Sequence, residues 1–181
     1  MIFRTEEDVT NWVNQNYSEK ELQRLNIFPA ASSEVPRALI AFKGISYKAI
    51  NEYLRKNPDG TETNEKLCEF QNCILERCIP TDVTVYRYVT FKEELWLNFS
   101  TQRGKICSYH GFLSTTLLEQ RYRELHPEIQ GRSVIEIQVP KGANGVYLPE
   151  VNPTKPDFEV IFPHKTKLEC IGVNKYKIVA E

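Results

Sequence analysis

The sequence predicts an α+β domain in which a mainly helical part, residues 1–80, precedes a strand-rich part, residues 81–181. Two observations of spacing support this. In the first part, apolar residues recur three or four positions apart, as on one face of a helix; after Pro80 the spacing changes to two, the period of a strand. The chain has 181 residues and no repeat or flexible linker, so a single domain with a sizeable core is expected.

The charge and composition exclude several classes of protein. The net charge of -1 gives no basic field for a nucleic-acid partner, and no apolar run is long enough to span a bilayer. The N-terminal residues contain early acids and lack the shape of a signal peptide, so we expect either a cytosolic protein or a domain cut from a larger exported one. The five cysteines and three histidines have no metal-site spacing, so free thiols and no metal are expected.

Capping signals and apolar stripes place the expected helices. The first follows Thr5 and buries Val9, Trp12 and Val13. Ser18 and Glu21 form a capping box for a second helix that Pro29 ends. Further helices are expected at residues 33–44, 46–57 and 63–78, the last with Leu67, Phe70, Ile74 and Leu75 facing inward.

The strand-rich part begins with a strand that carries a charge among apolar residues. Alternation places Arg87 on the same face as Val83, Val85 and Val89. One interpretation is a functional arginine, and the other is a side chain that extends to water at the strand end. After a short helix capped by Thr90 and Glu93, strands are expected at residues 111–116, 133–139, 167–172 and 176–179, with a partly helical loop at 117–131.

Residues 139–163 contain the strongest indication of a site. A strand, a glycine-rich turn and a second strand lead into a loop, residues 149–156, that contains three prolines and should be stiff. The loop ends at Asp157 and Glu159, which alternation places on one face of a strand with Phe158 on the other. Two carboxylates at the start of an apolar strand indicate a functional site.

These features occur in an order that resembles a known family. An arginine on a strand (Arg87), the Phe-Leu-Ser-Thr-Thr segment at residues 112–116, Val-Pro-Lys-Gly at 139–142 and the acid-x-Glu pair follow one another. This order resembles the Arg/Ser-Thr-Ser/Glu-x-Glu class of bacterial mono-ADP-ribosyltransferase toxins, above all the Rho-modifying exoenzymes and the enzymatic components of actin-modifying binary toxins. The segment Ile50-Asn-Glu-Tyr-Leu-Arg55 is also similar to that family, and the resemblance covers roughly residues 39–172.

The resemblance implies a fold and a set of roles. The fold would have N-terminal helices packed on a two-sheet, mostly antiparallel β core, and residues 81–181 would bind NAD, the co-substrate. Glu159 would be the catalytic glutamate, oriented by Ser114, and Arg87 would hold an NAD phosphate. The residues implied to bind NAD are Asn51, Arg55, Arg87, Thr115 and either Arg121 or Arg123. A carboxylate on the ribose suits this chemistry, because breaking the nicotinamide–ribose bond develops positive charge on the sugar.

Asp157 departs from the family's pattern, in which Glu or Gln usually stands. The resemblance makes residues 149–157 the loop that recognises the target protein and favours arginine as the acceptor, with asparagine or a hydroxyl side chain as alternatives. The expected function is transfer of ADP-ribose to a host protein such as a small GTPase or actin, after delivery into the host cytosol as part of a larger exported protein. An NAD glycohydrolase and a catalytically inactive binding module are the alternatives.

Overall fold

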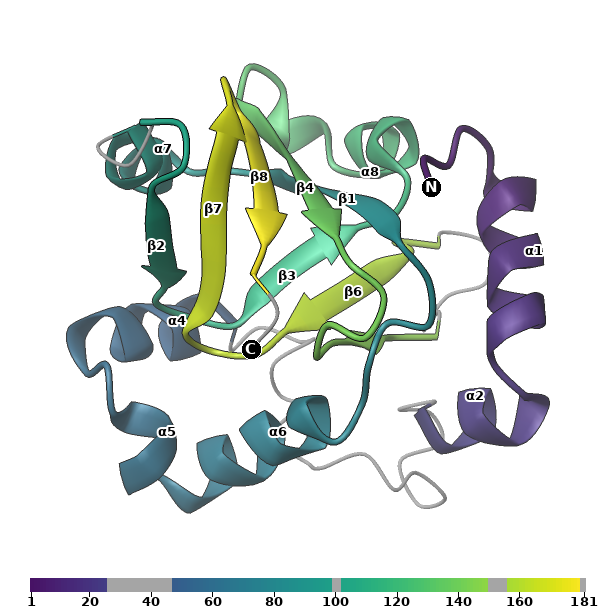
Figure 1. The fold of residues 1–181 in the computed structure, drawn as a ribbon, viewed down its shortest axis with the longest axis horizontal. Helices are drawn as coiled ribbons and strands as arrows, with labels where there is room; N and C mark the ends of the chain where they lie inside the picture. Colours follow the sequence, from purple (N-terminus) through teal and green to yellow (C-terminus); the bar gives the residue numbers. More distant parts are fainter. Residues whose placement is uncertain (26–46, 99–101, 150–155, 180–181) are drawn as a thin grey trace.

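The computed structural model describes residues 1–25, 47–98, 102–149 and 156–179, and within them helices surround one mixed β-sheet (Figure 1). The helices are α1 (Glu6–Asn16), α2 (Glu19–Leu25), α4 (Tyr47–Lys56), α5 (Gly60–Thr63), α6 (Glu65–Leu75), α7 (Phe91–Asn98) and α8 (Glu119–Leu125), followed by a 3-10 turn at Pro127–Ile129. The strands are β1 (Val83–Tyr88), β2 (Ile106–Tyr109), β3 (Leu113–Thr116), β4 (Val134–Val139), β5 (Val146–Tyr147), β6 (Glu159–Phe162), β7 (Thr166–Gly172) and β8 (Lys175–Ile178).

The predicted helix starts are confirmed at both capping boxes. Thr5 accepts from the backbone N–H of Asp8 and Asp8 bonds back to it, so α1 begins where expected. The Ser18 backbone N–H likewise donates to Glu21 at 2.7 Å ahead of α2. The helix end expected at Pro29 and the helix expected at residues 33–44 lie outside the described residues.

The helix expected at residues 63–78 is wrong in its bounds. Asn64 caps the helix by accepting from the Leu67 N–H at 3.3 Å, so α6 begins only at Glu65, and Thr63 belongs to the short helix α5 that precedes it. The α6 helix ends at Leu75, and that side chain is 43% exposed rather than inward. Leu67, Phe70 and Ile74 are buried as predicted.

The α+β class with a mostly antiparallel sheet is confirmed. The strand order is β2-β7-β8-β4-β1-β3-β6-β5, and β4 with β8 is a parallel pair among antiparallel neighbours. Hydrogen bonding joins these strands into one sheet, whereas the resemblance implied two. The join between β1 and β3 has one register pair, Tyr86 opposite Thr116, so the sheet consists of a five-strand half and a three-strand half.

The three-strand half is packed on both of its faces. Val160 and Phe162 of β6 belong to the larger core, which includes Trp12 of α1, whereas Ile161 belongs to a second core with Leu54 of α4 and residues of α6. Because a one-residue slip would exchange these two faces, the register of β6 is strongly specified. The position of Glu159 at the start of β6 is fixed by this packing.

Within the described ranges, no helix is both long and apolar enough to cross a membrane.

Candidate active site

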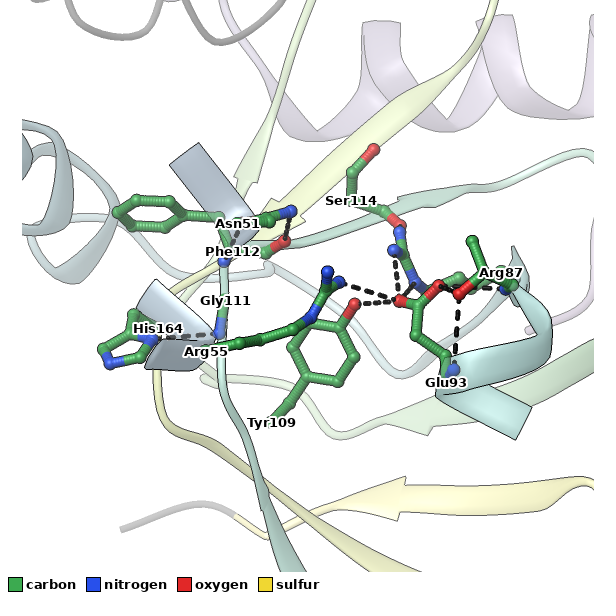
Figure 2. Close-up of polar contacts among 10 residues, drawn as sticks. Asn51, Arg55, Arg87, Glu93, Tyr109, Gly111, Phe112, Ser114 and His164 are labelled. Atoms are coloured by element: carbon green, nitrogen blue, oxygen red, sulfur yellow. Dashed lines mark hydrogen bonds and ion pairs between the residues drawn. The ribbon is translucent and has the colours of Figure 1, made fainter. Parts of the chain in front are cut away.

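The carboxylate of Glu93 collects donors from three separate elements. Its helix, α7, begins shortly after Arg87 of β1. Thr90 caps this helix by accepting from the Glu93 N–H at 3.3 Å, and it donates its own backbone N–H and its hydroxyl to Oε2 of Glu93 at 2.9 and 2.8 Å. The other oxygen, Oε1, accepts from Arg87 Nη2 at 2.6 Å, from Arg55 Nη2 at 3.3 Å and from the Tyr109 hydroxyl (Figure 2). The Glu93 side chain is 5% exposed, so this is a buried charged cluster.

Arg87 and Glu93 each stabilise the charged form of the other. Burial acts to raise the pKa of Glu93, but the positive charge of Arg87 and the surrounding hydrogen bonds outweigh it and lower the pKa to about 2. Burial acts to lower the pKa of Arg87, and the neighbouring Tyr109 and Glu93 outweigh it and raise that pKa. Arg87 and Glu93 are therefore both ionised at neutral pH.

Arg87 also connects β1 to β3. Its Nη1 donates to the backbone carbonyl of Ser114 at 2.7 Å, and its guanidinium lies 5.4 Å from the centre of the Tyr109 ring. The side chain is 14% exposed. Of the two interpretations given by the sequence, an arginine that extends to water at the strand end does not fit these contacts.

Ser114 and Glu159 form the pair that the sequence predicts. The Ser114 hydroxyl donates to Oε1 of Glu159 at 2.5 Å. In the β3–β6 ladder Ser114 is opposite Ile161 and Glu159 is opposite Thr116, so the two side chains are diagonal neighbours on one face. The contact gives the glutamate a fixed orientation beside the strand that Arg87 also contacts.

The two threonines after Ser114 have structural contacts in the described residues. The Thr115 hydroxyl donates to the Val160 carbonyl at 2.8 Å and its side chain is buried, so the predicted contact of Thr115 with NAD stays a prediction. The Thr116 hydroxyl donates to the backbone carbonyl of Asp157 at 2.8 Å. This bond fixes the end of the loop that precedes β6.

The predicted strand alternation fails at Phe158. Its φ is +48°, in the left-handed region, and β6 begins only at Glu159. Asp157 therefore ends the loop rather than starting the strand, and its Oδ1 lies 3.5 Å from Nε2 of His126. Burial, and next the charge of Glu159, raise the pKa of Tyr122 to about 12, with a smaller contribution from Asp157, so both acids lie near this tyrosine of α8.

Asn51 holds the start of β3. Its amide donates to the Phe112 carbonyl at 3.2 Å and accepts from the Phe112 N–H at 2.8 Å, and the side chain is 2% exposed (Figure 2). The preceding residue, Gly111, has a φ of +143° and passes so close that an added Cβ would lie 3.0 Å from Asn51 Oδ1. The predicted contact of Asn51 with the NAD ribose remains a prediction, as does that of Arg55, which is 41% exposed beside Glu93.

Buried His164 reinforces the same turn in its neutral form. Its Nδ1 accepts from the Gly111 N–H at 2.9 Å, and its Nε2 lies 2.7 Å from the Pro58 carbonyl, to which it donates. Burial lowers the pKa of His164, which agrees with an imidazole that must keep one nitrogen as an acceptor. His164 thus ties the α4–α5 connection to the turn before β3.

The two candidate arginines of α8 have different partners. Arg121 Nε lies 2.8 Å from Glu6 Oε1 and thereby links α8 to α1. Arg123 donates to Glu119 Oε1 at 2.5 Å and to the Tyr88 hydroxyl at 3.0 Å. A contact between either guanidinium and a phosphate requires it to share or leave these partners, and both remain predictions.

Sequence reasoning missed several residues of this region. It treated Glu93 only as a helix cap, although a carboxylate so soon after the strand arginine was a usable signal. Tyr109 carried no such signal, because β2 pairs with β7 at the far edge of the sheet and only tertiary packing brings its ring to Arg87. Tyr122 and His126 were part of a segment interpreted as a loop.

Across the described ranges, no group of three or more His, Cys, Asp or Glu side chains is arranged to hold a metal ion.

The geometry defines a site with two guanidinium groups on one buried carboxylate and, across β3, a glutamate oriented by a serine hydroxyl. The family model described as ADP-ribosyltransferase exoenzyme matches residues 9–180. The chain belongs to this family of ADP-ribosyltransferases. Among curated protein sequences, none matches this chain.

Solved structures of toxins share the fold. The chain is similar to Plx2a, an ADP-ribosyltransferase toxin from Paenibacillus larvae, with 19% identity and a TM-score of 0.70 over 99% of this chain and 100% of that one. It is similar to an ADP-ribosyltransferase from Clostridium botulinum, with 16% identity and a TM-score of 0.65 over 98% and 96%. It is also similar to BECa of a binary enterotoxin of C. perfringens, solved with NADH, with 19% identity and a TM-score of 0.67 over 97% of this chain and 49% of that one.

Proposed function

We propose that this protein cleaves the nicotinamide–ribose bond of NAD and transfers ADP-ribose to a side chain of a host protein. The observation that carries the proposal is the 2.5 Å hydrogen bond from Ser114 to Glu159. It sets a carboxylate beside the strand that the Arg87 guanidinium also contacts. Family membership supports the reaction class, and the BECa structure with NADH supports a nicotinamide dinucleotide as the ligand.

The residues present fit NAD. Arg87 and Arg55 supply two guanidinium groups, and a planar guanidinium suits a diphosphate because it forms paired, charge-assisted hydrogen bonds. Their shared partner, Glu93, fixes both before the substrate arrives. Arg121 or Arg123 would add a phosphate contact from α8, and Asn51 and Thr115 would act near the ribose or through the β3 backbone.

In the proposed reaction, Glu159 accepts a hydrogen bond from the ribose 2′-hydroxyl as positive charge develops on the sugar. The bond between the ribose C1′ and the nicotinamide nitrogen breaks, and its electron pair leaves with nicotinamide, which becomes neutral. The acceptor side chain then forms the new bond to C1′ and releases one proton. Fixed electrostatics of this kind are commonly the largest catalytic term, and no strong general acid is needed because the leaving group is neutral.

Two alternatives differ in what takes the ribose. In an NAD glycohydrolase water is the acceptor, and in an inactive binding module no bond breaks. Incubation of the protein with labelled NAD and a eukaryotic lysate, followed by mass spectrometry of the labelled protein, distinguishes all three. A labelled side chain supports the transferase, release of nicotinamide without label supports the glycohydrolase, and neither product supports the module.

The target and the delivery route belong to the same proposal. A small GTPase or actin is the proposed class of target, because the motifs resemble those of Rho-modifying exoenzymes and actin-modifying binary toxins, and BECa, which has the same fold, belongs to a binary enterotoxin. We propose delivery into the host cytosol as part of an exported toxin, with no nucleic acid as partner and no insertion of this chain into a membrane. The whole chain, residues 1–181, would act as one catalytic domain.

Arg87→Lys is expected to weaken NAD binding and to lower activity. A lysine retains the charge but cannot reproduce the fork that contacts both Glu93 and the Ser114 carbonyl. Losing one charge-assisted bond costs about 1.5–3 kcal/mol, so the dissociation constant should rise by about tenfold or more. Titration calorimetry with NAD measures it. Unchanged affinity together with unchanged activity would remove Arg87 from NAD binding.

Asp157→Ala is expected to separate the two activities. Asp157 lies at the end of the loop that is proposed to recognise the target, so its removal should reduce protein modification by about tenfold or more while much of the NAD hydrolysis persists. Initial rates of both reactions, measured in one preparation, give the comparison. If both rates fall together, or neither changes, Asp157 is not an acceptor-side residue and the preference for arginine as the acceptor fails with it.

A further inference from the structure

His126 stands between two carboxylates at the edge of the candidate site. It follows α8, and its backbone N–H donates to the Tyr122 carbonyl at 3.1 Å, which fixes the main chain. Its Nε2 lies 3.5 Å from Asp157 Oδ1 and its Nδ1 lies 3.1 Å from Glu128 Oε1. The ring also packs against Tyr122, with 4.2 Å between the ring centres.

The number of N–H groups that the His126 ring can donate depends on its protonation state. A neutral imidazole has one N–H and one acceptor nitrogen, whereas an imidazolium has two N–H groups. Ionised Asp157 and Glu128 can only accept. Both contacts of His126 are therefore favourable at once only when the ring is an imidazolium. Two negative charges and one positive charge leave the cluster with one net negative charge, which still attracts a guanidinium.

Asp157 is held at two points, through its main chain by Thr116 and through its side chain by His126. The Asp157 carbonyl accepts from the Thr116 hydroxyl at 2.8 Å, which fixes the backbone. The side chain of Asp157 is 36% exposed and has the His126 ring on one side. A carboxylate accepts from more than one donor, so a contact with His126 is compatible with a contact to an incoming acceptor.

We propose that His126 is a positioning residue for the acceptor step, in which its imidazolium holds the Asp157 carboxylate in the orientation that receives the target side chain. This inference rests on the proposed transferase function. It adds a residue whose charge tunes protein modification without a contact to the nicotinamide–ribose bond. Holding a group in place before binding increases affinity because less ordering is left to the binding step.

The proposal predicts that the charge at position 126 affects one activity more than the other. Among the described residues, Asp157, Glu128 and Tyr122 contact His126, and the charge of Arg132 acts on Glu128. A neutral side chain at position 126 would release Asp157. The ratio of protein ADP-ribosylation to NAD hydrolysis should therefore fall in a neutral variant.

The test compares His126→Asn with His126→Lys in the full chain. Initial rates of label incorporation from NAD into proteins of a eukaryotic lysate, and of nicotinamide release without lysate, are measured at one pH. His126→Asn is neutral, so it should lower the ratio about fivefold, through a higher KM for the lysate proteins. His126→Lys keeps a cation, so it should restore most of the ratio. Nicotinamide release should be unchanged in both variants.

Several outcomes would overturn the inference. It fails if His126→Asn leaves the ratio as in the wild type, if it raises the ratio, or if nicotinamide release falls in step with label incorporation. It also fails if His126→Lys behaves like His126→Asn. Failure of the proposed function looks different, since the wild type itself would then release nicotinamide without labelling any protein, and an acceptor-side role for His126 would fall with it.

Discussion

Replacing Glu159 with glutamine is expected to abolish both protein ADP-ribosylation and NAD hydrolysis while the protein stays folded. Glutamine has the same shape and can still accept the hydrogen bond from Ser114, which lies 2.5 Å from Oε1 in the wild type. It removes the negative charge that opposes the cation forming on the ribose. The loss of one such group costs about 2.7–4 kcal/mol, or about 100- to 1,000-fold in kcat. Release of nicotinamide, followed at saturating NAD, measures it.

Two controls show that the effect concerns the reaction and not the fold. The circular dichroism spectrum and the urea midpoint of Glu159→Gln should match those of the wild type, and the NAD affinity by calorimetry should change little, because the charge is needed most in the transition state. Turnover like that of the wild type in Glu159→Gln would remove Glu159 from the mechanism.

Replacing Glu93 with glutamine is expected to destabilise the fold and to weaken NAD binding together. The carboxylate is buried and accepts from Arg87, Arg55 and Tyr109. Neutralising it leaves the buried Arg87 guanidinium without its counter-charge, which costs about 3–5 kcal/mol. Urea unfolding at neutral pH measures this cost. Glu52→Gln is the matched control, because Glu52 forms an exposed ion pair with Lys56 and its loss should leave the urea midpoint close to that of the wild type.

The same substitution predicts a change in acid sensitivity. The pKa of Glu93 in the folded protein is lowered from 4.5 to about 2, so its ionised form contributes stability that is fully present above pH 4.5 and is lost as the pH falls toward 2. In Glu93→Gln this part of the pH dependence should disappear. A variant whose stability equals that of the wild type at neutral pH, with the same decline in acid, would show that Glu93 is not the counter-charge of Arg87.

Local patterns in the sequence were enough to predict the parts of the site that depend on strand alternation and on order along the chain. Arg87 and Ser114 lie on strands as the spacing of their neighbours predicted, and the contact between Ser114 and Glu159 was predicted from the resemblance. The convergence of Arg55 and Tyr109 on Glu93 could not be predicted, because it joins α4, β2 and α7 through tertiary packing.

Backbone conformation explains the other differences between expectation and structure. Phe158 adopts a positive φ although it is neither glycine nor asparagine, so no local signal showed that alternation ends there. Leu75 was placed inward by the helical stripe, but α6 ends at that residue and its side chain is left exposed. The start of α6 after Asn64, rather than at Thr63, was readable in principle, because asparagine is a common N-cap.

The single register pair between β1 and β3 forms a seam between the two halves of the sheet, and the proposed substrate would bind across it. Arg87 stands in the five-strand half of the sheet, and Ser114 and Glu159 stand in the three-strand half. The bond from Arg87 to the Ser114 carbonyl crosses this seam, and a dinucleotide with its diphosphate on Arg87 and its nicotinamide ribose on Glu159 would cross it a second time. A ligand that binds only the assembled form stabilises it. The dinucleotide would therefore stabilise the association of the two halves of the sheet, and this association would be less stable after the dinucleotide leaves.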